Sequence, residues 1–304
     1  MITVGNAAGW LKRPADFTTG LLRIPTEFLH AITLGSYTLA PRPGNSGTTF
    51  WSDGEDHPTS LNALGLPNPG IEEVAEFLFP LARDIHNSGK IVRVSIAGFS
   101  PEEYEEAVGK LLGIRYVNSF ELNFGCPNVR VDGAQERIMS FDPDELERTL
   151  RLVDSHTDHV GAPGIDVKLS PYSDPYLRTE VGRVLRKNSR KFQHLVTCNT
   201  FGNAFGFRPE GSPLIGANDG YAGLAGKPLK YIALGEVRQF VHMLQGENPV
   251  IGVGGVSWGQ DLLDFERAGA VAAQIGTEYF ASNDPRVFYR TGVDYAELRE
   301  TVPV

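Results

Sequence analysis

The sequence predicts an α/β fold, a single (β/α)8 TIM barrel domain over residues 1–304 with inserted loops on its carboxyl-end face. Two observations predict it. Eight short β-branched or apolar runs recur along the chain, each followed by a Gly, Asn or Pro turn. Most of the segments between these runs have helical periodicity. Such alternation is typical of a parallel sheet, and eight units favour a closed barrel over an open sheet.

The elements follow in order from this alternation. The predicted strands are residues 2–8, 31–38, 91–97, 119–124, 165–169, 195–200, 250–253 and 271–276. Helix 72–87 opens on acidic residues, and helix 101–112 follows Ser100, which forms a capping-box pattern with Glu103. The other predicted helices are residues 142–155, 176–188, 230–244 and 260–267.

Three connections are longer than a plain barrel needs, namely residues 39–70, 126–141 and 201–228. Each follows a predicted strand, so all three are expected on the carboxyl-end face, where barrel enzymes build their active sites. The chain has no internal repeat beyond the alternation, no low-complexity tract and no linker that indicates a second domain.

Composition limits the function. The formal net charge of −9 disfavours a nucleic acid partner, which needs a basic surface. Two cysteines are too few for a disulfide framework or a cysteine-rich metal site, so we expect no metal and a reducing, cytoplasmic location. The sequence has no apolar run long enough to span a membrane and no signal peptide. Because the first strand begins almost at Met1, we expect no membrane-docking extension before it.

Glycines mark two strand ends. The seventh strand runs into Gly254 and Gly255, and the eighth runs into Gly276 and Thr277. In barrels these two ends commonly form a phosphate site, because glycine lets a ligand approach the backbone N–H groups. A third small-residue loop, residues 219–228, favours a phosphate-bearing cofactor. The simpler alternative is that glycines only end the strands.

Polar side chains follow other strands. Cys126 lies in a turn after the predicted fourth strand. At this position a thiol can serve as a nucleophile or general base. The alternative is that this lone cysteine is a small buried apolar residue. For Cys198, inside the predicted sixth strand, burial is the better interpretation. Lys168 ends an apolar strand and needs an anion nearby, whereas Lys12 follows the first strand and fits either the same rim or a solvated surface.

Four asparagines fall in strand-end loops. An amide both donates and accepts hydrogen bonds, so asparagines that converge on one pocket recognise a flat ring of alternating N–H and C=O groups. Each one alone is more often a turn residue or a cap. They are Asn62, Asn123, Asn128 and Asn199.

These segments, in order, resemble the dihydroorotate dehydrogenases, FMN enzymes of pyrimidine biosynthesis built on this barrel. The resemblance covers nearly the whole chain and rests on six motifs, among them residues 61–68, 121–128 and 220–234. It implies FMN as cofactor and a substrate site formed by Asn62, Gly65, Leu66, Asn123, Asn128, Asn199 and Thr200. It also implies an FMN site formed by Ala8, Gly9, Lys12, Asn123, Lys168, Gly223, Gly254, Gly255, Gly276 and Thr277.

The resemblance implies a mixed type of enzyme. Cys126 stands where the soluble class 1 members carry their catalytic base, whereas class 2 members carry serine there. Class 1 members also have a lysine in the second strand, and here ungapped alignment places Gly35 at that position. Class 2 members carry a lysine after the first strand, so Lys12 is expected to replace the missing one.

The implied reaction converts dihydroorotate to orotate, with proton removal from C5 by Cys126 and hydride transfer from C6 to FMN. We expect a homodimer that uses a soluble electron acceptor, such as fumarate or NAD through a partner subunit, and no membrane quinone. Two alternatives stay open. One is a tRNA dihydrouridine synthase, against which the acidic charge argues, and the other is a flavin-binding protein that has lost turnover.

Overall fold

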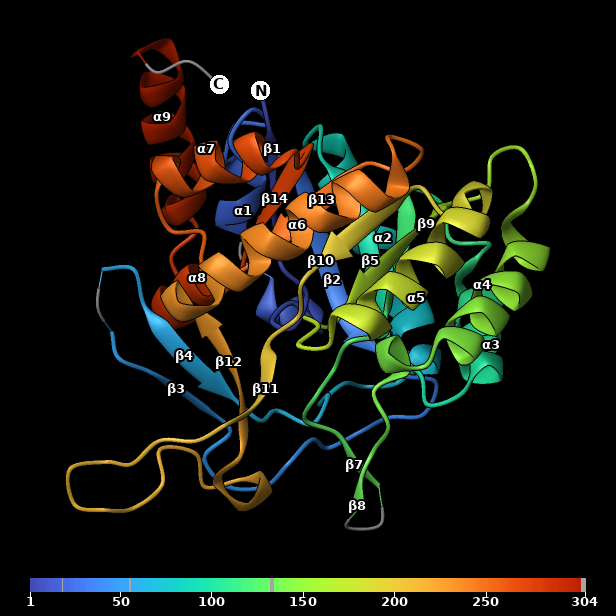
Figure 1. Cartoon of the computed structure of the whole chain (residues 1–304). Helices are drawn as coiled ribbons and strands as arrows, with labels where there is room; N and C mark the ends of the chain where they lie inside the picture. Colours follow the sequence, from blue (N-terminus) through green and yellow to red (C-terminus); the bar gives the residue numbers. More distant parts are fainter. Residues whose placement is uncertain (18, 55, 132–133, 302–304) are drawn as a thin grey trace.

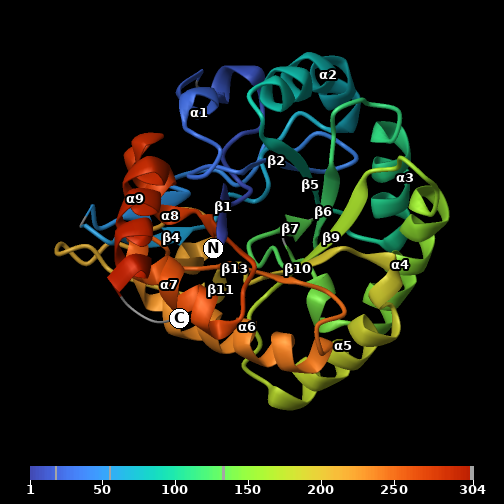
Figure 2. The ribbon, with the colours of Figure 1, turned by 90° about the horizontal axis from the view of Figure 1, so that it is seen from above.

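A closed ring of parallel strands forms the centre of the computed structural model, which describes residues 1–17, 19–54, 56–131 and 134–301. The strands follow one another around the barrel in chain order, and helices surround them (Figure 2). The barrel strands are β1 (Thr3–Asn6), β2 (Ala31–Tyr37), β5 (Ile91–Ile96), β6 (Ser119–Asn123), β9 (Gly164–Leu169), β10 (His194–Thr197), β13 (Val250–Val253) and β14 (Ala272–Ile275). The predicted barrel is therefore confirmed.

The helices pack their apolar faces on the outside of the barrel. They are α1 (Thr19–Arg23), α2 (Ile71–Asn87), α3 (Pro101–Leu111), α4 (Pro143–Thr157), α5 (Pro175–Lys187), α6 (Lys230–Leu244), α7 (Gly259–Ala268), α8 (Thr277–Ser282) and α9 (Arg286–Thr301).

Local signals explain where several helices begin. Helices α3, α4 and α5 each open on a proline, whose missing N–H costs nothing at that position. The Asp142 and Asp174 side chains cap α4 and α5 by accepting backbone N–H groups of the first turn. Ser100 accepts the Glu103 N–H as predicted, but the Glu103 carboxylate accepts the N–H of Phe99 instead of that of Ser100.

The sequence interpretation missed α1, α8 and α9. The sequence nevertheless contains a pattern that predicts α9, because its buried residues repeat with helical spacing. These residues are Val287, Phe288, Thr291 and Tyr295. The Tyr295 hydroxyl accepts the Ile2 N–H and donates to Glu266, which fastens α9 to the start of β1 and to α7. The start of β1 and the end of α9 lie on this side of the molecule (Figure 1).

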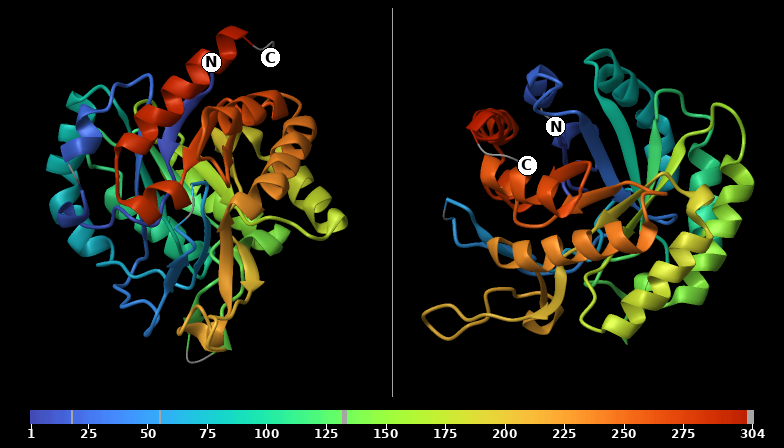
Figure 3. Two further views of the ribbon diagram at one scale, coloured as in Figure 1. Left: turned by 90° about the vertical axis from the view of Figure 1, so that its left-hand side faces the viewer. Right: turned by 45° about the horizontal axis from the view of Figure 1, so that its top comes forward.

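The inserted loops build a cover on the opposite face (Figures 1 and 3). A four-stranded sheet has the order β11-β12-β4-β3, and a separate hairpin pairs β7 with β8. The bounds are β3 (Phe50–Ser52), β4 (Thr59–Asn62), β7 (Arg130–Val131), β8 (Ala134–Gln135), β11 (Phe201–Ala204) and β12 (Ala222–Gly226). Residues 55, 132 and 133 of the predicted loops lie outside the described residues. The organisation of residues 1–304 as one domain stays a prediction.

Successive residues of a strand point to opposite faces, so alternate residues of β9 point into the barrel, and there they are polar. Asp166 accepts hydrogen bonds from Arg93 at 2.6 Å and Ser119 at 2.8 Å, and its other oxygen lies 2.7 Å from His194 Nδ1. The Arg93 and His194 charges hold the pKa of Asp166 at about 2 despite its burial. Lys168, two residues further along, has the same inward direction and reaches the carboxyl end of the barrel.

Candidate active site

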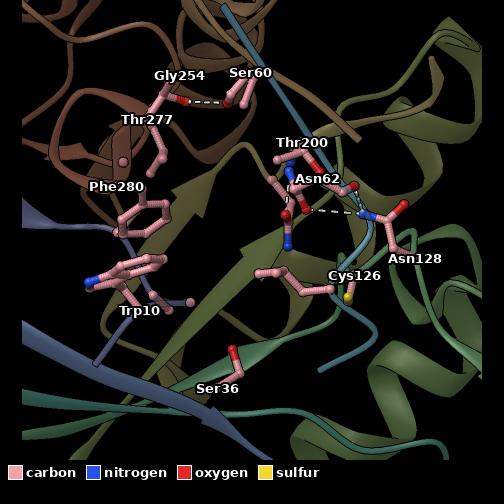
Figure 4. Close-up of a pocket in the computed structure, with 18 of the residues that line it drawn as sticks. Trp10, Ser36, Ser60, Asn62, Cys126, Asn128, Thr200, Gly254, Thr277 and Phe280 are labelled. Carbon is pink, nitrogen blue, oxygen red and sulfur yellow. Dashed lines mark hydrogen bonds between the residues drawn. The ribbon is translucent and has the colours of Figure 1, made fainter. Parts of the chain in front are cut away.

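A cavity opens at the carboxyl end of the barrel, between the strand ends and the four-stranded sheet (Figure 4). Its lining includes every predicted site residue except Gly223. Those residues are Ala8, Gly9, Lys12, Asn62, Gly65, Leu66, Asn123, Cys126, Asn128, Lys168, Asn199, Thr200, Gly254, Gly255, Gly276 and Thr277.

The four asparagines converge in two hydrogen-bonded pairs. Asn128 Nδ2 donates to the backbone oxygen of Asn62 at 2.7 Å and to its Oδ1 at 3.1 Å. Asn199 Nδ2 donates to Asn123 Oδ1 at 3.0 Å, and Asn123 Nδ2 donates to Ser36 Oγ at 2.9 Å. Both pairs face the cavity, so the amides form a polar wall suited to a planar ring with donors and acceptors on its edge.

Cys126 lies half-buried in the turn after β6 and lines the same cavity as Asn128 (Figure 4). Burial raises the pKa of the thiol. The Asn128 N–H and the positive charges of Lys12, Arg42 and Lys168 act in the opposite direction. The thiol is thus the predominant form at neutral pH, and proton abstraction by this side chain requires its ionisation.

The two lysines reach the cavity from different strands. Lys168 is 4% exposed and its Nζ lies 3.5 Å from Glu121 Oε1, so the anion that its burial requires is present. Lys12 is 8% exposed, which excludes a solvated position. Burial lowers the pKa of Lys12 to about 8, while the charges of Cys126 and Asp16 act in the opposite direction. Among the described residues, its ammonium group forms no hydrogen bond or ion pair.

The end of the cavity formed by Gly254, Gly255 and Gly276, here called the glycine end, exposes backbone N–H groups. In the described part of the chain, no group accepts from the N–H of Gly254, Gly255 or Gly276. Gly255 has a φ of +72°, and an added Cβ would lie 2.8 Å from Lys230 Cβ and 2.9 Å from the Gly226 oxygen. Only glycine leaves this approach open, and open N–H groups suit a phosphate.

The structure places one predicted cofactor residue, Gly223, outside the cavity lining, and its role stays a prediction. Gly223 does not line the cavity, because its carbonyl accepts from Asn62 Nδ2 at 3.2 Å and an added Cβ would lie 2.1 Å from Thr200 Oγ1. Gly226, three residues further along β12, lies at the glycine end instead. The prediction that Cys198 lies inside a strand is wrong, since β10 ends at Thr197, although Cys198 is buried as expected.

The sequence interpretation missed several lining residues. Trp10 and Phe280 stack with ring centroids 5.6 Å apart and form the aromatic end of the cavity (Figure 4). Ser60 Oγ lies 2.9 Å from Thr277 Oγ1 at the glycine end. The position of Trp10 between the predicted site residues Gly9 and Lys12 indicates that it lines the site. Nothing in the sequence singles out Phe280.

The described residues contain no helix long and apolar enough to cross a membrane. Within the same residues, no group of three or more His, Cys, Asp and Glu side chains is arranged to hold a metal ion.

The fold and the cavity together define a class of protein, a barrel oxidoreductase that holds a phosphorylated planar cofactor beside a small polar substrate. Residues 3–291 match the family model of dihydroorotate dehydrogenase. This chain belongs to the dihydroorotate dehydrogenase family, whose members are FMN-dependent enzymes that oxidise dihydroorotate in pyrimidine biosynthesis.

Curated relatives agree with this assignment. The chain is 34% identical over 279 residues to dihydroorotate dehydrogenase A (fumarate) of Lacticaseibacillus paracasei, which covers 90% of this chain and 87% of the relative. It is 31% identical over 294 residues to the catalytic subunit of dihydroorotate dehydrogenase B (NAD(+)) of Parabacteroides distasonis, covering 94% and 88%. These matches favour dihydroorotate dehydrogenase over tRNA dihydrouridine synthase.

A solved structure has the same fold. The crystal structure of DHODH from Eimeria tenella in complex with ferulenol superposes with a TM-score of 0.79 at 20% identity, covering 99% of this chain and 82% of that one.

Proposed function

We propose that Cys126 is the general base with which this family member oxidises dihydroorotate to orotate. The observation that carries the proposal is that the Cys126 thiol shares one cavity with four asparagines and two buried lysines. A base must lie within reach of the proton that it removes, here the proton on C5 of the substrate. FMN, when bound, accepts the hydride from C6.

The two asparagine pairs are proposed to hold the pyrimidine ring. Asn62 approaches from the four-stranded sheet, and Asn128 approaches from the base loop, which is the loop after β6 that carries Cys126. Asn123 and Asn199 approach from the ends of β6 and β10. Amides that face a ring from two sides fix its orientation, which brings C5 to the thiol and lowers the entropic part of the barrier.

The cofactor site fits the residues present. We propose that the open N–H groups of Gly254, Gly255 and Gly276 and the hydroxyl of Thr277 hold the phosphate of FMN. Lys12 and Lys168 are proposed to lie beside the ring, where a positive charge stabilises the negative charge that develops during hydride transfer. A lysine without an anionic partner, as Lys12 is here, supports a bound anion.

The electron acceptor is proposed to be soluble, either fumarate or NAD through a partner subunit. The names of two relatives, one a fumarate enzyme and one the catalytic subunit of an NAD(+) enzyme, support this choice. Both cysteines are free, which agrees with the proposed cytoplasmic location.

We also propose that the chain forms a homodimer. Beside the four-stranded sheet, the Phe205 ring makes edge-to-face contacts with Phe207 and Tyr221, and the three residues are 41%, 68% and 50% exposed. Clustered exposed aromatic side chains are typical of an interface. Multi-angle light scattering of the parent and of Phe207→Ser tests this proposal, and two monomeric proteins would contradict it.

A single mixing experiment tests the catalytic proposal. The FMN-loaded protein is mixed anaerobically with dihydroorotate, and the flavin absorbance is followed. We expect bleaching, followed by recovery of the absorbance on addition of fumarate or of NAD with an electron-transfer subunit. A flavin that stays oxidised would favour the alternative of a flavin-binding protein without turnover, and recovery only with a quinone would contradict the soluble acceptor.

A further inference from the structure

A buried hydrogen-bond chain leads from helix α6 to the peptide bond in front of Cys126. We infer that Ser170 is a positioning residue that fixes the Cys126 thiol, and that Ser140, Tyr172 and Glu236 hold Ser170 in place. The inference rests on the proposed role of Cys126 as the base.

Ser170 holds the peptide group that joins Gly125 to Cys126. Ser170 Oγ donates to the Gly125 carbonyl at 3.0 Å, and the Gly125 N–H donates to Asn123 Oδ1 at 3.2 Å. Both backbone polar groups of Gly125 are thus occupied. Since the carbonyl belongs to the peptide that precedes Cys126, its orientation determines the direction in which the Cys126 side chain leaves the backbone.

Gly125 is packed against the end of β9 without room for a side chain. A Cβ added at Gly125 would lie 2.7 Å from the Ser170 nitrogen and 2.8 Å from the Leu169 carbonyl carbon. The backbone N–H of Phe124 also donates to the Lys168 carbonyl at 2.9 Å. The base loop therefore lies directly on the strand that carries Lys168, and Ser170 is the hydroxyl at that contact.

Three further residues hold Ser170. Its N–H donates to Ser140 Oγ at 3.3 Å, and the Tyr172 hydroxyl donates to the Ser140 carbonyl at 2.6 Å. The Tyr172 N–H donates to Glu236 Oε1 on α6 at 3.2 Å. None of these side chains is more than 5% exposed, so water does not compete for the hydrogen bonds.

Ser170 does not line the substrate cavity, so it acts on the reaction through Cys126 and not by contact with substrate. Reacting groups held in an attack geometry lose about 100-fold in rate for a misplacement of roughly 1 Å. Removal of the Ser170 hydroxyl should therefore lower the rate of flavin reduction much more than it weakens substrate binding.

The test compares Ser170→Ala with Thr149→Val, in FMN-loaded protein, by stopped-flow reduction with dihydroorotate. Thr149 is a matched control because it is fully buried and its hydroxyl donates to the Glu145 carbonyl within α4, away from the base loop. We expect Ser170→Ala to lower the limiting reduction rate by about 10-fold to 100-fold, with the dihydroorotate Kd within about threefold of the parent. The flavin of Thr149→Val should be reduced at the parent rate. Ser170→Thr should recover part of the reduction rate lost in Ser170→Ala.

A second readout does not depend on turnover. Iodoacetamide alkylation of the apoprotein reports the Cys126 thiol, because Cys198 is 1% exposed and a Cys126→Ser variant supplies the blank. We expect the alkylation rate of Ser170→Ala to differ at least about threefold from the parent, and that of Thr149→Val to match it.

Tyr172→Phe keeps the inference testable if Ser170→Ala does not fold, since it removes only the hydroxyl that holds Ser140. It should slow reduction by about threefold to tenfold. Reduction rates within twofold of the parent for every folded variant of Ser170 and Tyr172 would overturn the inference. A Cys126→Ser variant with the parent rate would instead overturn the proposed base itself, so the two failures are distinguishable.

Discussion

The backbone N–H of Gly35 donates a hydrogen bond to the carbonyl of Leu11 at 2.8 Å, and the Gly35 carbonyl accepts from the Gly9 N–H at 2.7 Å. Gly35 thereby holds the turn that presents Lys12 to the cavity. Its φ of +96° favours glycine, and an added Cβ would lie 2.5 Å from the Ser95 carbonyl oxygen. Gly35, the position where the resemblance implies a lysine in class 1 members, thus supports the turn that carries Lys12.

This geometry leaves no room for a side chain at residue 35, so a lysine introduced there is not expected to compensate for a missing Lys12. Gly35→Lys should destabilise the protein, as should Gly35→Ala, by about 3 kcal/mol, because the clash adds to the backbone strain. Gly246→Ala is the matched control, since Gly246 has a φ of +80° with nothing within 4 Å of an added Cβ. It should cost only about 1 kcal/mol in urea unfolding. If Gly35→Ala and Gly246→Ala lower the free energy of unfolding equally, the contact with the Ser95 carbonyl oxygen does not contribute.

Lys12→Ala should slow flavin reduction by about 10-fold to 100-fold and lower the flavin potential, because it removes a positive charge beside the developing negative charge. Lys187→Ala is the control, as Lys187 is an exposed residue of α5 that pairs with Glu147. Stopped-flow reduction and a reductive titration give the two quantities. If Lys12→Ala reduces at the parent rate, the lysine after β1 does not replace the one missing from β2.

Cys126→Ser should lower the reduction rate by at least about 100-fold while FMN stays bound, because a hydroxyl is a much weaker base. Burial raises the pKa of the Cys126 thiol, so the parent rate should increase with pH as the thiolate fraction grows. Above the thiol pKa the parent rate levels off and the ratio of the two rates narrows. A parent rate that is flat from about pH 7 to pH 10 would contradict ionisation of Cys126 as the controlling step.

Glu236 should make stability depend on pH. Burial raises the pKa of Glu236 from 4.5 to about 7, although the Tyr172 N–H and Arg178 act against the rise. Between these values the native state binds more protons than the unfolded state, so the free energy of unfolding falls as pH rises from about 4.5 to 7. The loss is at most about 3 kcal/mol.

Glu236→Gln should therefore be more stable than the parent at about pH 8 and should lose this advantage at about pH 5. Glu247→Gln, at an exposed position after α6, is the control and should show no such crossover. Urea unfolding at both pH values measures the difference. An advantage of Glu236→Gln that does not change with pH would contradict ionisation of this carboxyl group in the native state.

Much of the candidate site could be predicted because most of its motifs lie at the end of a barrel strand. In a parallel barrel all strand ends with one polarity meet on one face, so Asn123, Lys168 and Gly254 were expected together before any contact was known. The helices missed were the short α1, which lies between β1 and β2, and α8 and α9, which follow the last strand.

The position of Gly223 outside the cavity lining could not be predicted, because it depends on the register between segments that are far apart in the sequence. In the four-stranded sheet Gly223 pairs with Asn62, whereas Gly226 pairs with Thr59, and this offset places Gly226 at the glycine end of the cavity. A register shift changes which residues face a cavity, and nothing local to residues 222–226 specifies it.

The sequence by itself determined the barrel, its active face and the residue types of the site, because hydrophobic periodicity and turn residues act over a few neighbouring positions. Only the tertiary structure decided that Lys12 is buried at the cavity, that Gly35 cannot carry a side chain and that Ser170 holds the peptide before Cys126. These features depend on contacts between residues far apart in the sequence, as between Leu11 and Gly35, 24 positions apart, or Gly35 and Ser95, 60 positions apart. Such contacts exist only once the barrel has closed and its packing has excluded water.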